Sequence, residues 1–187
     1  MLRHGESTLN AEGRITGTLN IELTPKGRIE AVALRDRLMP PYELILSSSL
    51  RRARETLEYA MTAAGLQAPY YVDCRLNERS LGILEGENER PIPQFASGDL
   101  DFAPAGGETY REVCQRCLSL LLDLYRWSRD HKGARALLST HMGPLRVLMA
   151  IINGVKRADR MMALNFKNTQ LVTARLDLVP WPPFLED

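Results

Sequence analysis

Short apolar runs alternate with segments of helical spacing along this chain, and that alternation limits the folds it can adopt. Short apolar runs are typical of buried strands, and apolar side chains three or four residues apart are typical of helices packed on one side. The predicted strands are a stub ending at Arg3 and residues 44–46, 70–72, 136–138 and 170–176, and the later predicted helices are residues 50–64, 108–130 and 145–153. This succession predicts a mostly parallel sheet with helices on both faces, a three-layer α/β/α sandwich.

The first predicted helix has clear boundary signals. Thr24 is a favoured N-cap and Pro25 is favoured at the first helical position. Two consecutive prolines, Pro40 and Pro41, end the helix, and residues 11–23 before it predict a loop. Its apolar side is predicted to comprise Ile29, Ala33 and Leu38.

The composition excludes several classes of protein. The chain has 187 residues, 44% hydrophobic and 25% charged, which predicts one soluble domain over residues 1–187. A net charge of +1 argues against a nucleic-acid or membrane-surface binder. No apolar run approaches the ~18 residues that span a bilayer, and the start has no signal-peptide pattern. The odd number of cysteines, three, favours a reduced, cytoplasmic setting.

Polar clusters follow three of the predicted strands. They are His4 after the stub, residues 47–52 after the second strand and His141 after residues 136–138. Ligands of open α/β sheets bind beyond the carboxyl ends of the strands, so we expect these clusters to share a site. Arg3 offers a fork of donors for phosphate, and His4 is a candidate nucleophile. Arg52 falls in the first turn of a helix, where a phosphate is also favoured.

The same segments carry a series of short motifs in order. They are Arg3-His4-Gly5-Glu6-Ser7 with Asn10; residues 23–27, Leu-Thr-Pro-Lys-Gly; residues 47–56, containing Ser-Ser, Leu50, Arg52-Ala53 and Thr56; Leu76-Asn77-Glu78 with Gly82 and Glu85-Gly86; residues 106–109, Gly-Gly-Glu-Thr; and Ser139-Thr140-His141. Together they resemble the motifs of the histidine phosphatase superfamily, also called the phosphoglycerate mutase-like family, over almost the whole chain. The resemblance implies that family's α/β/α fold and phosphoryl-transfer chemistry without a metal or other cofactor.

The resemblance also implies the central roles. His4 would attack phosphorus and become a phosphohistidine. The three transferring oxygens would be held by Arg3, Arg52 and His141. His4 must attack as a neutral imidazole, so we expect its other ring nitrogen to donate to a backbone carbonyl.

Further residues are implied around this centre. Glu78 would give a proton to the leaving oxygen and later take one from water. Substrate-binding positions would be Asn10, Thr16, Gly17, Arg79 and Met142. Two features depart from the family pattern. Met142 stands where a glycine usually follows the second histidine, and only Met1 and Leu2 precede Arg3, so the first strand is a stub or continues upstream of this numbering.

Three functions stay open at this stage. The segment 86–107 is short for a mutase and is predicted to cover the site as an insert, with Arg90, Gln94, Phe95, Asp99 and Phe102 as candidate lid residues. Its shortness favours a phosphatase acting on a small phosphorylated substrate. A mutase is the alternative, because residues 76–79, Leu-Asn-Glu-Arg, resemble the corresponding sequence of mutases and Arg79 could hold a substrate carboxylate. A binding module that has lost turnover is the third, and a homodimer stays open.

Several of these side chains have ordinary structural alternatives. Asn10 could cap a turn, and Glu78 could be one of several solvated carboxylates. Cys114 and Cys117 have redox spacing but lie within a predicted helix, which indicates packing. His131 is predicted to lie at the end of that helix.

Overall fold

A four-stranded parallel sheet forms the centre of the molecule. The structure, a computed structural model, describes residues 1–89, 93–96, 98–180 and 182–185. The strand order is β1-β4-β2-β3. The strands are β1 (Leu2–Arg3), β2 (Leu44–Ser47), β3 (Tyr71–Val72) and β4 (Ala136–Thr140). The predicted parallel α/β fold is therefore confirmed.

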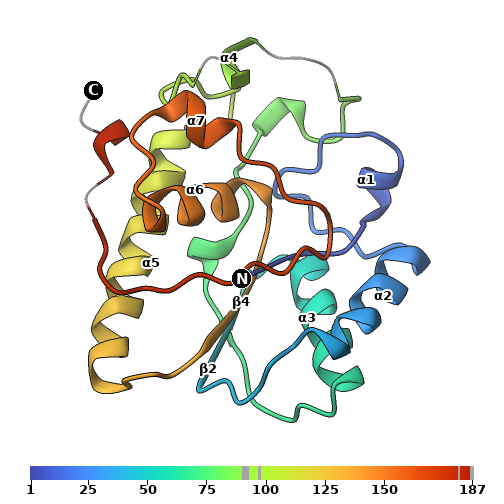
Figure 1. Cartoon of the computed structure of the whole chain (residues 1–187). Coiled ribbons are helices and arrows are strands. Elements are labelled where there is room, and N and C mark those ends of the chain that lie inside the picture. Colours follow the sequence, from blue (N-terminus) through green and yellow to red (C-terminus); the bar gives the residue numbers. More distant parts are fainter. Residues whose placement is uncertain (90–92, 97, 181, 186–187) are drawn as a thin grey trace.

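Helices cover both faces of the sheet, as Figure 1 shows, with α2 and α3 on one side and α5 and α6 on the other. The longer helices are α2 (Pro25–Val32), α3 (Arg51–Ala63), α5 (Tyr110–Asp130) and α6 (Met142–Ile152). The short ones are α1 (Thr8–Ala11), α4 (Pro93–Ala96) and α7 (Ala158–Met162), with 3₁₀ turns at Ala33–Asp36, Cys74–Leu76, Gly82–Leu84 and Pro183–Leu185. None of the helices in the described ranges is long and apolar enough to cross a membrane.

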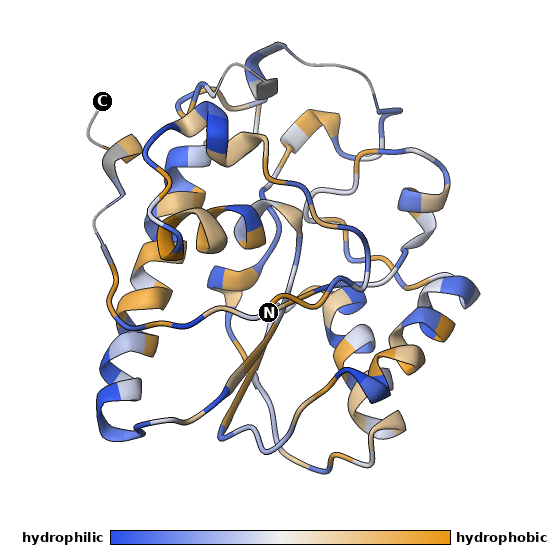
Figure 2. Cartoon of the chain, viewed as in Figure 1, coloured by the Kyte–Doolittle hydropathy of each residue, from blue (hydrophilic) through white to orange (hydrophobic). Residues whose placement is uncertain are grey.

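Alternate residues of the central strands enter two separate cores. In β4, Leu137 packs under α3, whereas Leu138 packs on the α5 and α6 side. Ile45 and Leu46 divide in the same way in β2. Successive side chains of a strand point to opposite faces, so a strand covered on both faces is apolar throughout. Figure 2 shows β2 and β4 largely in hydrophobic colours.

Two predictions about elements are wrong. Residues 170–176 do not form a strand; this segment makes one antiparallel bridge, between Leu171 and Leu2, and the Val172 amide donates to the Met1 carbonyl over 2.8 Å. The β1 strand has only two residues, so it offers too few backbone groups for a longer ladder. Ile29 is 71% exposed. The first helix turns Ala31, Leu34 and Leu38 inward, at spacings of three and four residues. Ala33 lies on the exposed side with Ile29, whereas the predicted Leu38 is buried.

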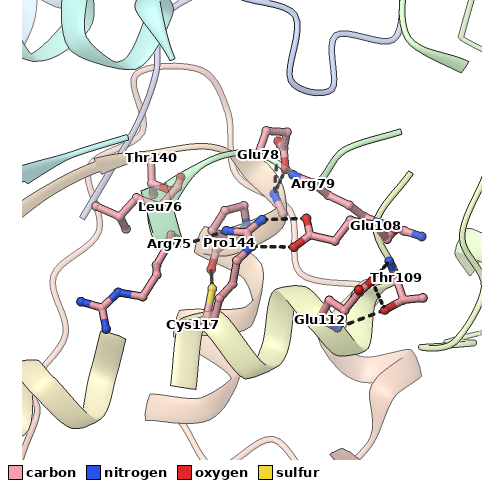
Figure 3. Close-up of polar contacts among 12 residues, drawn as sticks. Arg75, Leu76, Glu78, Arg79, Glu108, Thr109, Glu112, Cys117, Thr140 and Pro144 are labelled. Carbon is pink, nitrogen blue, oxygen red and sulfur yellow. Dashed lines mark hydrogen bonds and ion pairs between the residues drawn. The ribbon is translucent and has the colours of Figure 1, made fainter. Parts of the chain in front are cut away.

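The long helix α5 begins two residues later than predicted, and its cap explains the position. The Thr109 hydroxyl accepts from the Glu112 amide over 3.1 Å, and the Glu112 carboxylate accepts from the Thr109 amide over 2.7 Å (Figure 3). This reciprocal capping box starts the helix at Tyr110. Cys114 and Cys117 are both fully buried on α5, which confirms their packing role.

Candidate active site

The register of the sheet brings the two predicted histidines together. Arg3 pairs with Thr140 in the parallel β1–β4 ladder, so His4 and His141 are the next residues of neighbouring strands. Their ring centroids lie 5.0 Å apart. Both rings are buried. Residues that are 137 positions apart in the sequence thus meet at the carboxyl edge of the sheet, with Ser48 following β2 beside them.

His4 presents one ring nitrogen that carries no hydrogen and can accept. Its Nδ1 lies 2.7 Å from the Gly5 carbonyl oxygen. A carbonyl oxygen only accepts, so Nδ1 carries the hydrogen and Nε2 has the lone pair, as the expected attack requires. Burial, followed by the nearby Arg52 and Arg3 charges, holds the pKa of His4 well below its usual range. His4 is therefore a neutral imidazole at neutral pH.

Arg52 lies against that lone pair. Its Nε donates to His4 Nε2 over 3.3 Å, and its two terminal nitrogens donate to the carbonyls of Leu19 and Gly17 over 2.8 and 2.7 Å. The side chain is fully buried, and burial lowers its pKa to about 10, so it stays charged at neutral pH. The Thr56 hydroxyl donates to the Arg52 carbonyl and accepts from the Gly5 amide over 2.9 Å, which ties α3 to the turn after His4.

Arg3 contributes a second guanidinium from the end of β1. Its Nη1 donates to the Phe166 carbonyl, and its buried Nε has no partner among the described residues. Burial lowers the pKa of Arg3, and the charge of Glu78 acts against that effect. An unpaired buried N–H is costly unless an anion or water meets it. A phosphoryl oxygen would satisfy it.

Glu78 lies at the amino end of α6. Its Oε1 accepts from the Gly143 amide over 3.0 Å. The same oxygen accepts from the Arg79 amide over 2.9 Å (Figure 3). The segment before it is anchored by the Thr140 hydroxyl, which donates to the Leu76 carbonyl over 2.8 Å (Figure 3). A carboxylate is favoured at a helix N-terminus, and this one is further held by two backbone donors.

The glycine that this contact needs is Gly143, one residue after Met142. A Cβ at position 143 would lie 2.3 Å from Glu78 Oε1. Met142 is the first residue of α6 and is partly exposed. The backbone that approaches the Glu78 carboxylate closely is therefore that of residue 143, and Met142 does not obstruct this contact. The sequence did not indicate a role for Gly143, because in the family pattern the glycine directly follows the second histidine.

The predicted substrate-binding residues divide into two groups. Asn10 Oδ1 accepts from the Ser7 hydroxyl over 2.9 Å as part of the α1 cap, and its Nδ2 donates to the Thr16 hydroxyl over 3.3 Å. Gly17 supports Arg52 through its carbonyl. Arg79 has different partners: its Nε donates to the Glu108 carbonyl over 2.7 Å, and its guanidinium lies 4.4 Å from the ring centroid of Tyr110.

A second glutamate of the motif supports this loop. Glu85 Oε1 accepts from the Thr18 amide and from the Leu81 amide, each over 2.9 Å. Gly17 has a φ of +48°, and a Cβ there would lie 2.2 Å from the same oxygen. Glu85 thus orients the loop whose carbonyls hold Arg52. Its place in the sequence motif was visible, but its partner on a remote loop was not.

The predicted covering segment is described only in part. Arg90 lies outside the described residues, as does the side chain of Phe95. Leu100 is buried in the α5 core, and its carbonyl accepts from the Arg111 amide over 2.9 Å. The Phe102 carbonyl accepts from Arg79 Nη2 over 2.6 Å. This part of the segment is therefore packed onto the helix that follows it.

Comparison with known proteins identifies the family. The family model of the histidine phosphatase superfamily (branch 1) matches residues 1–179. The chain belongs to the histidine phosphatase superfamily. A metal-independent phosphoserine phosphatase of Arabidopsis thaliana is 31% identical over 175 residues, which cover 87% of this chain and 71% of that protein. A 2,3-bisphosphoglycerate-dependent phosphoglycerate mutase of Gloeobacter violaceus is 32% identical over 160 residues, 80% of this chain and 72% of that protein.

Solved structures agree with this assignment. The structure of a mycobacterial glucosyl-3-phosphoglycerate phosphatase complexed with VO3 superposes with a TM-score of 0.77 at 31% identity, covering 90% of this chain and 88% of that one. This histidine phosphatase superfamily member therefore shares its fold with a phosphatase, and it shares sequence with phosphatases and mutases alike.

Proposed function

We propose that the chain hydrolyses phosphomonoesters of small metabolites through a phosphohistidine on Nε2 of His4. The observation that carries this proposal is the hydrogen bond from His4 Nδ1 to the Gly5 carbonyl over 2.7 Å. It leaves Nε2 unprotonated in a site that contains Arg52 and Arg3. A neutral nucleophile with cations beside it is what attack on an anionic phosphorus requires.

The first half of the reaction makes the phosphohistidine. Nε2 of His4 bonds to phosphorus while the bond to the ester oxygen breaks. Arg3, Arg52 and His141 hold the three equatorial oxygens, whose charge persists through the transition state. Glu78 acts as the general acid and gives a proton to the leaving oxygen, so the product leaves as an alcohol. Arg52 Nε, which lies 3.3 Å from His4 Nε2, moves onto a phosphoryl oxygen as substrate binds.

The second half restores the enzyme. The Glu78 carboxylate takes a proton from a water molecule as its oxygen bonds to phosphorus. The P–N bond breaks, and His4 becomes a neutral imidazole again. Inorganic phosphate leaves and Glu78 is protonated once more, so one turnover consumes only ester and water. The amides of Gly143 and Arg79 hold Glu78 Oε1 at 3.0 and 2.9 Å. Oε2, which is 3.4 Å from the Gly143 amide, is the oxygen that exchanges the proton.

A test compares two histidine variants. We expect His4→Ala to lower the release of phosphate from an aryl phosphate by about a thousandfold or more, because it removes the nucleophile. His131→Ala is the matched control, since that exposed ring lies at the end of α5, where it stacks on Trp127. Equal activity in His4→Ala and the control, both folded by circular dichroism, would rule out the assignment of His4.

A mutase is the second candidate, favoured by the relative from Gloeobacter violaceus and by the sequence around Glu78. A mutase must shield the phosphohistidine from water and return the phosphoryl group to a second hydroxyl. Incubation with 3-phosphoglycerate separates the two, with free phosphate expected from a phosphatase. Formation of the isomer without free phosphate would overturn our preference.

A binding module is the third candidate, and turnover of any phosphomonoester in a substrate panel excludes it.

The remaining assignments extend the same proposal. We propose that the whole chain is one domain and that residues 86–107 cover the site, because Leu100 and Phe102 tie that segment to α5 and Arg79. Arg79 as a ligand for a substrate carboxylate stays a prediction. A cytoplasmic setting and a homodimer are likewise proposals. The exposed Cys74 supports the former, since it fits a reducing compartment.

A further inference from the structure

Ser48 contacts His141 on the side of the ring away from the unpaired nitrogen. Its Oγ lies 2.7 Å from His141 Nε2. The same Oγ lies 2.8 Å from Asn77 Oδ1 and accepts from the Leu50 amide over 3.1 Å. Ser48 and His141 are both fully buried, so water does not compete for these bonds. His141 Nδ1, also buried, has no hydrogen-bond partner in the described ranges.

The hydrogens of this chain of bonds can be assigned. The Ser49 amide donates to Asn77 Oδ1 over 2.9 Å, so that atom is an oxygen and accepts. The single Ser48 hydrogen must then point to Asn77, because two lone pairs would otherwise face each other over 2.8 Å. Ser48 Oγ is left as the acceptor for His141. It follows that Nε2 of His141 carries the hydrogen and Nδ1 carries the lone pair.

The two histidines are thereby held in opposite tautomers. His4 keeps its hydrogen on Nδ1 and His141 keeps its hydrogen on Nε2. A lone pair on His141 Nδ1 would repel a phosphoryl oxygen, whereas an N–H there would bind it. The site as it stands therefore lacks one proton for the anion that it is proposed to hold.

We propose that Ser48 is a positioning residue that holds His141 as its Nε2–H tautomer, so that the site takes up one proton at His141 Nδ1 when it binds a phosphate dianion. This inference rests on the proposed function, because it assumes that phosphate binds beside His141. The proton comes from solution, or equivalently the phosphate enters as a monoanion and gives its proton to Nδ1. Either route ends with an imidazolium beside a dianion.

The surroundings explain why this proton arrives only with the anion. The charged or titratable groups that act on His141 are Arg52 from α3, His4 and Arg3 at the end of β1, and Arg116 from α5. Burial and these groups all disfavour an imidazolium, so free His141 is neutral. A bound phosphate brings two negative charges into the same volume and reverses the balance.

Isothermal titration with inorganic phosphate, at about pH 8 where phosphate is mostly a dianion, measures the proton uptake. Titrations in buffers of different ionisation enthalpy should show about one proton taken up per phosphate bound, and the affinity should fall about tenfold between pH 8 and pH 9. In Ser48→Ala the Nδ1–H tautomer becomes available and can donate directly. Uptake should drop below about half a proton, and the pH dependence should flatten.

Ser49→Ala is the matched control, because Ser49 also bonds to Asn77 Oδ1 but has no bond to His141, and it should keep the full uptake. Nitrogen-15 spectra of histidine-labelled protein locate the proton, and only three histidines need assignment. An Nδ1–H tautomer for His141 in the free wild-type protein would overturn the proposal even if Ser48→Ala failed to fold. Wild-type binding without uptake, or equal uptake in Ser48→Ala, would do the same.

These measurements are separable from the test of function. Phosphate binding and tautomer state are read without turnover. A protein that hydrolyses esters but binds phosphate with no proton uptake retains the proposed function and loses this inference. Uptake at His141 in a protein without turnover would leave the inference standing and remove the hydrolase.

Discussion

The backbone amide of Gly143 donates to Oε1 of Glu78 over 3.0 Å, and no Cβ fits between them. This contact joins the first turn of α6, which directly follows His141, to the segment that follows Leu76. One turn of backbone thus positions both the second histidine and the carboxylate. The relative placement of the proposed phosphate ligand and the proposed proton donor depends on that turn.

Gly143→Ala is predicted to lower kcat by about tenfold to a hundredfold, because the new Cβ would lie 2.3 Å from Oε1 and displace Glu78. Alanine has a higher helix propensity than glycine, so the melting temperature should stay within a few degrees. Asn153→Ala, at the exposed C-terminal end of the same helix, is the control and should stay within about threefold of wild type. Steady-state kinetics with an aryl phosphate measures both, and unchanged kcat in Gly143→Ala would contradict the role of Glu78.

Arg52→Lys is predicted to lower kcat/KM by about a hundredfold or more. A lysine cannot span His4 Nε2 and the carbonyls of Gly17 and Leu19 together, as the guanidinium does. The carbonyls left without a donor should also lower the free energy of unfolding by about 1–3 kcal/mol. Arg51→Lys, at an exposed position, should change neither quantity. Kinetics well below the melting temperature and urea unfolding test this, and wild-type activity in Arg52→Lys would contradict it.

The stability of the ligand-free protein is predicted to fall as pH falls below about 6.5. His4 and His141 have folded-state pKa values well below the ordinary 6.5, so between those values the unfolded chain binds protons that the folded one does not. Each histidine should therefore remove up to about 1.4 kcal/mol per pH unit in this window, and stability should be regained as pH rises through 6.5.

Urea unfolding between about pH 5 and pH 8 gives the slope. In His141→Gln the slope of the unfolding free energy against pH should be smaller by the contribution of one histidine. His131→Gln should keep the wild-type slope. The Met1 amine, whose pKa burial lowers to about 6, contributes equally to all of these proteins and cancels in the comparison. A His141→Gln slope equal to that of wild type would mean that His141 is not held neutral.

Thiol labelling of the native protein is predicted to modify Cys74 alone. Cys114 and Cys117 are buried on α5, and burial raises the pKa of the Cys114 thiol to about 12 and that of Cys117 further. One equivalent of a thiol reagent should react in buffer and three in denaturant. Cys74→Ser should show no rapid reaction in buffer. Rapid modification of a second thiol would show that the α5 core opens.

Local features of the fold could be predicted from the residues alone. Thr24 and Pro25 mark the start of α2, and the apolar stripe of residues 113–124 marks α5, because capping and helical spacing depend on neighbours in sequence. The strands of β2 and β4 follow from short apolar runs. The motifs around His4, Arg52, Glu78 and His141 likewise pointed to one family and to one set of site residues.

Tertiary structure decided which site residues lie next to one another. These contacts depend on the register of the sheet and on side chains from remote segments. The pairing of Arg3 with Thr140 places His4 beside His141, and no local pattern specifies that pairing. Gly143 and Ser48 acquire their roles only through Glu78 and His141, which arrive from remote segments. The exposed Ile29 and the missing strand at 170–176 have the same cause, since the burial of a side chain and the length of a ladder depend on what lies opposite.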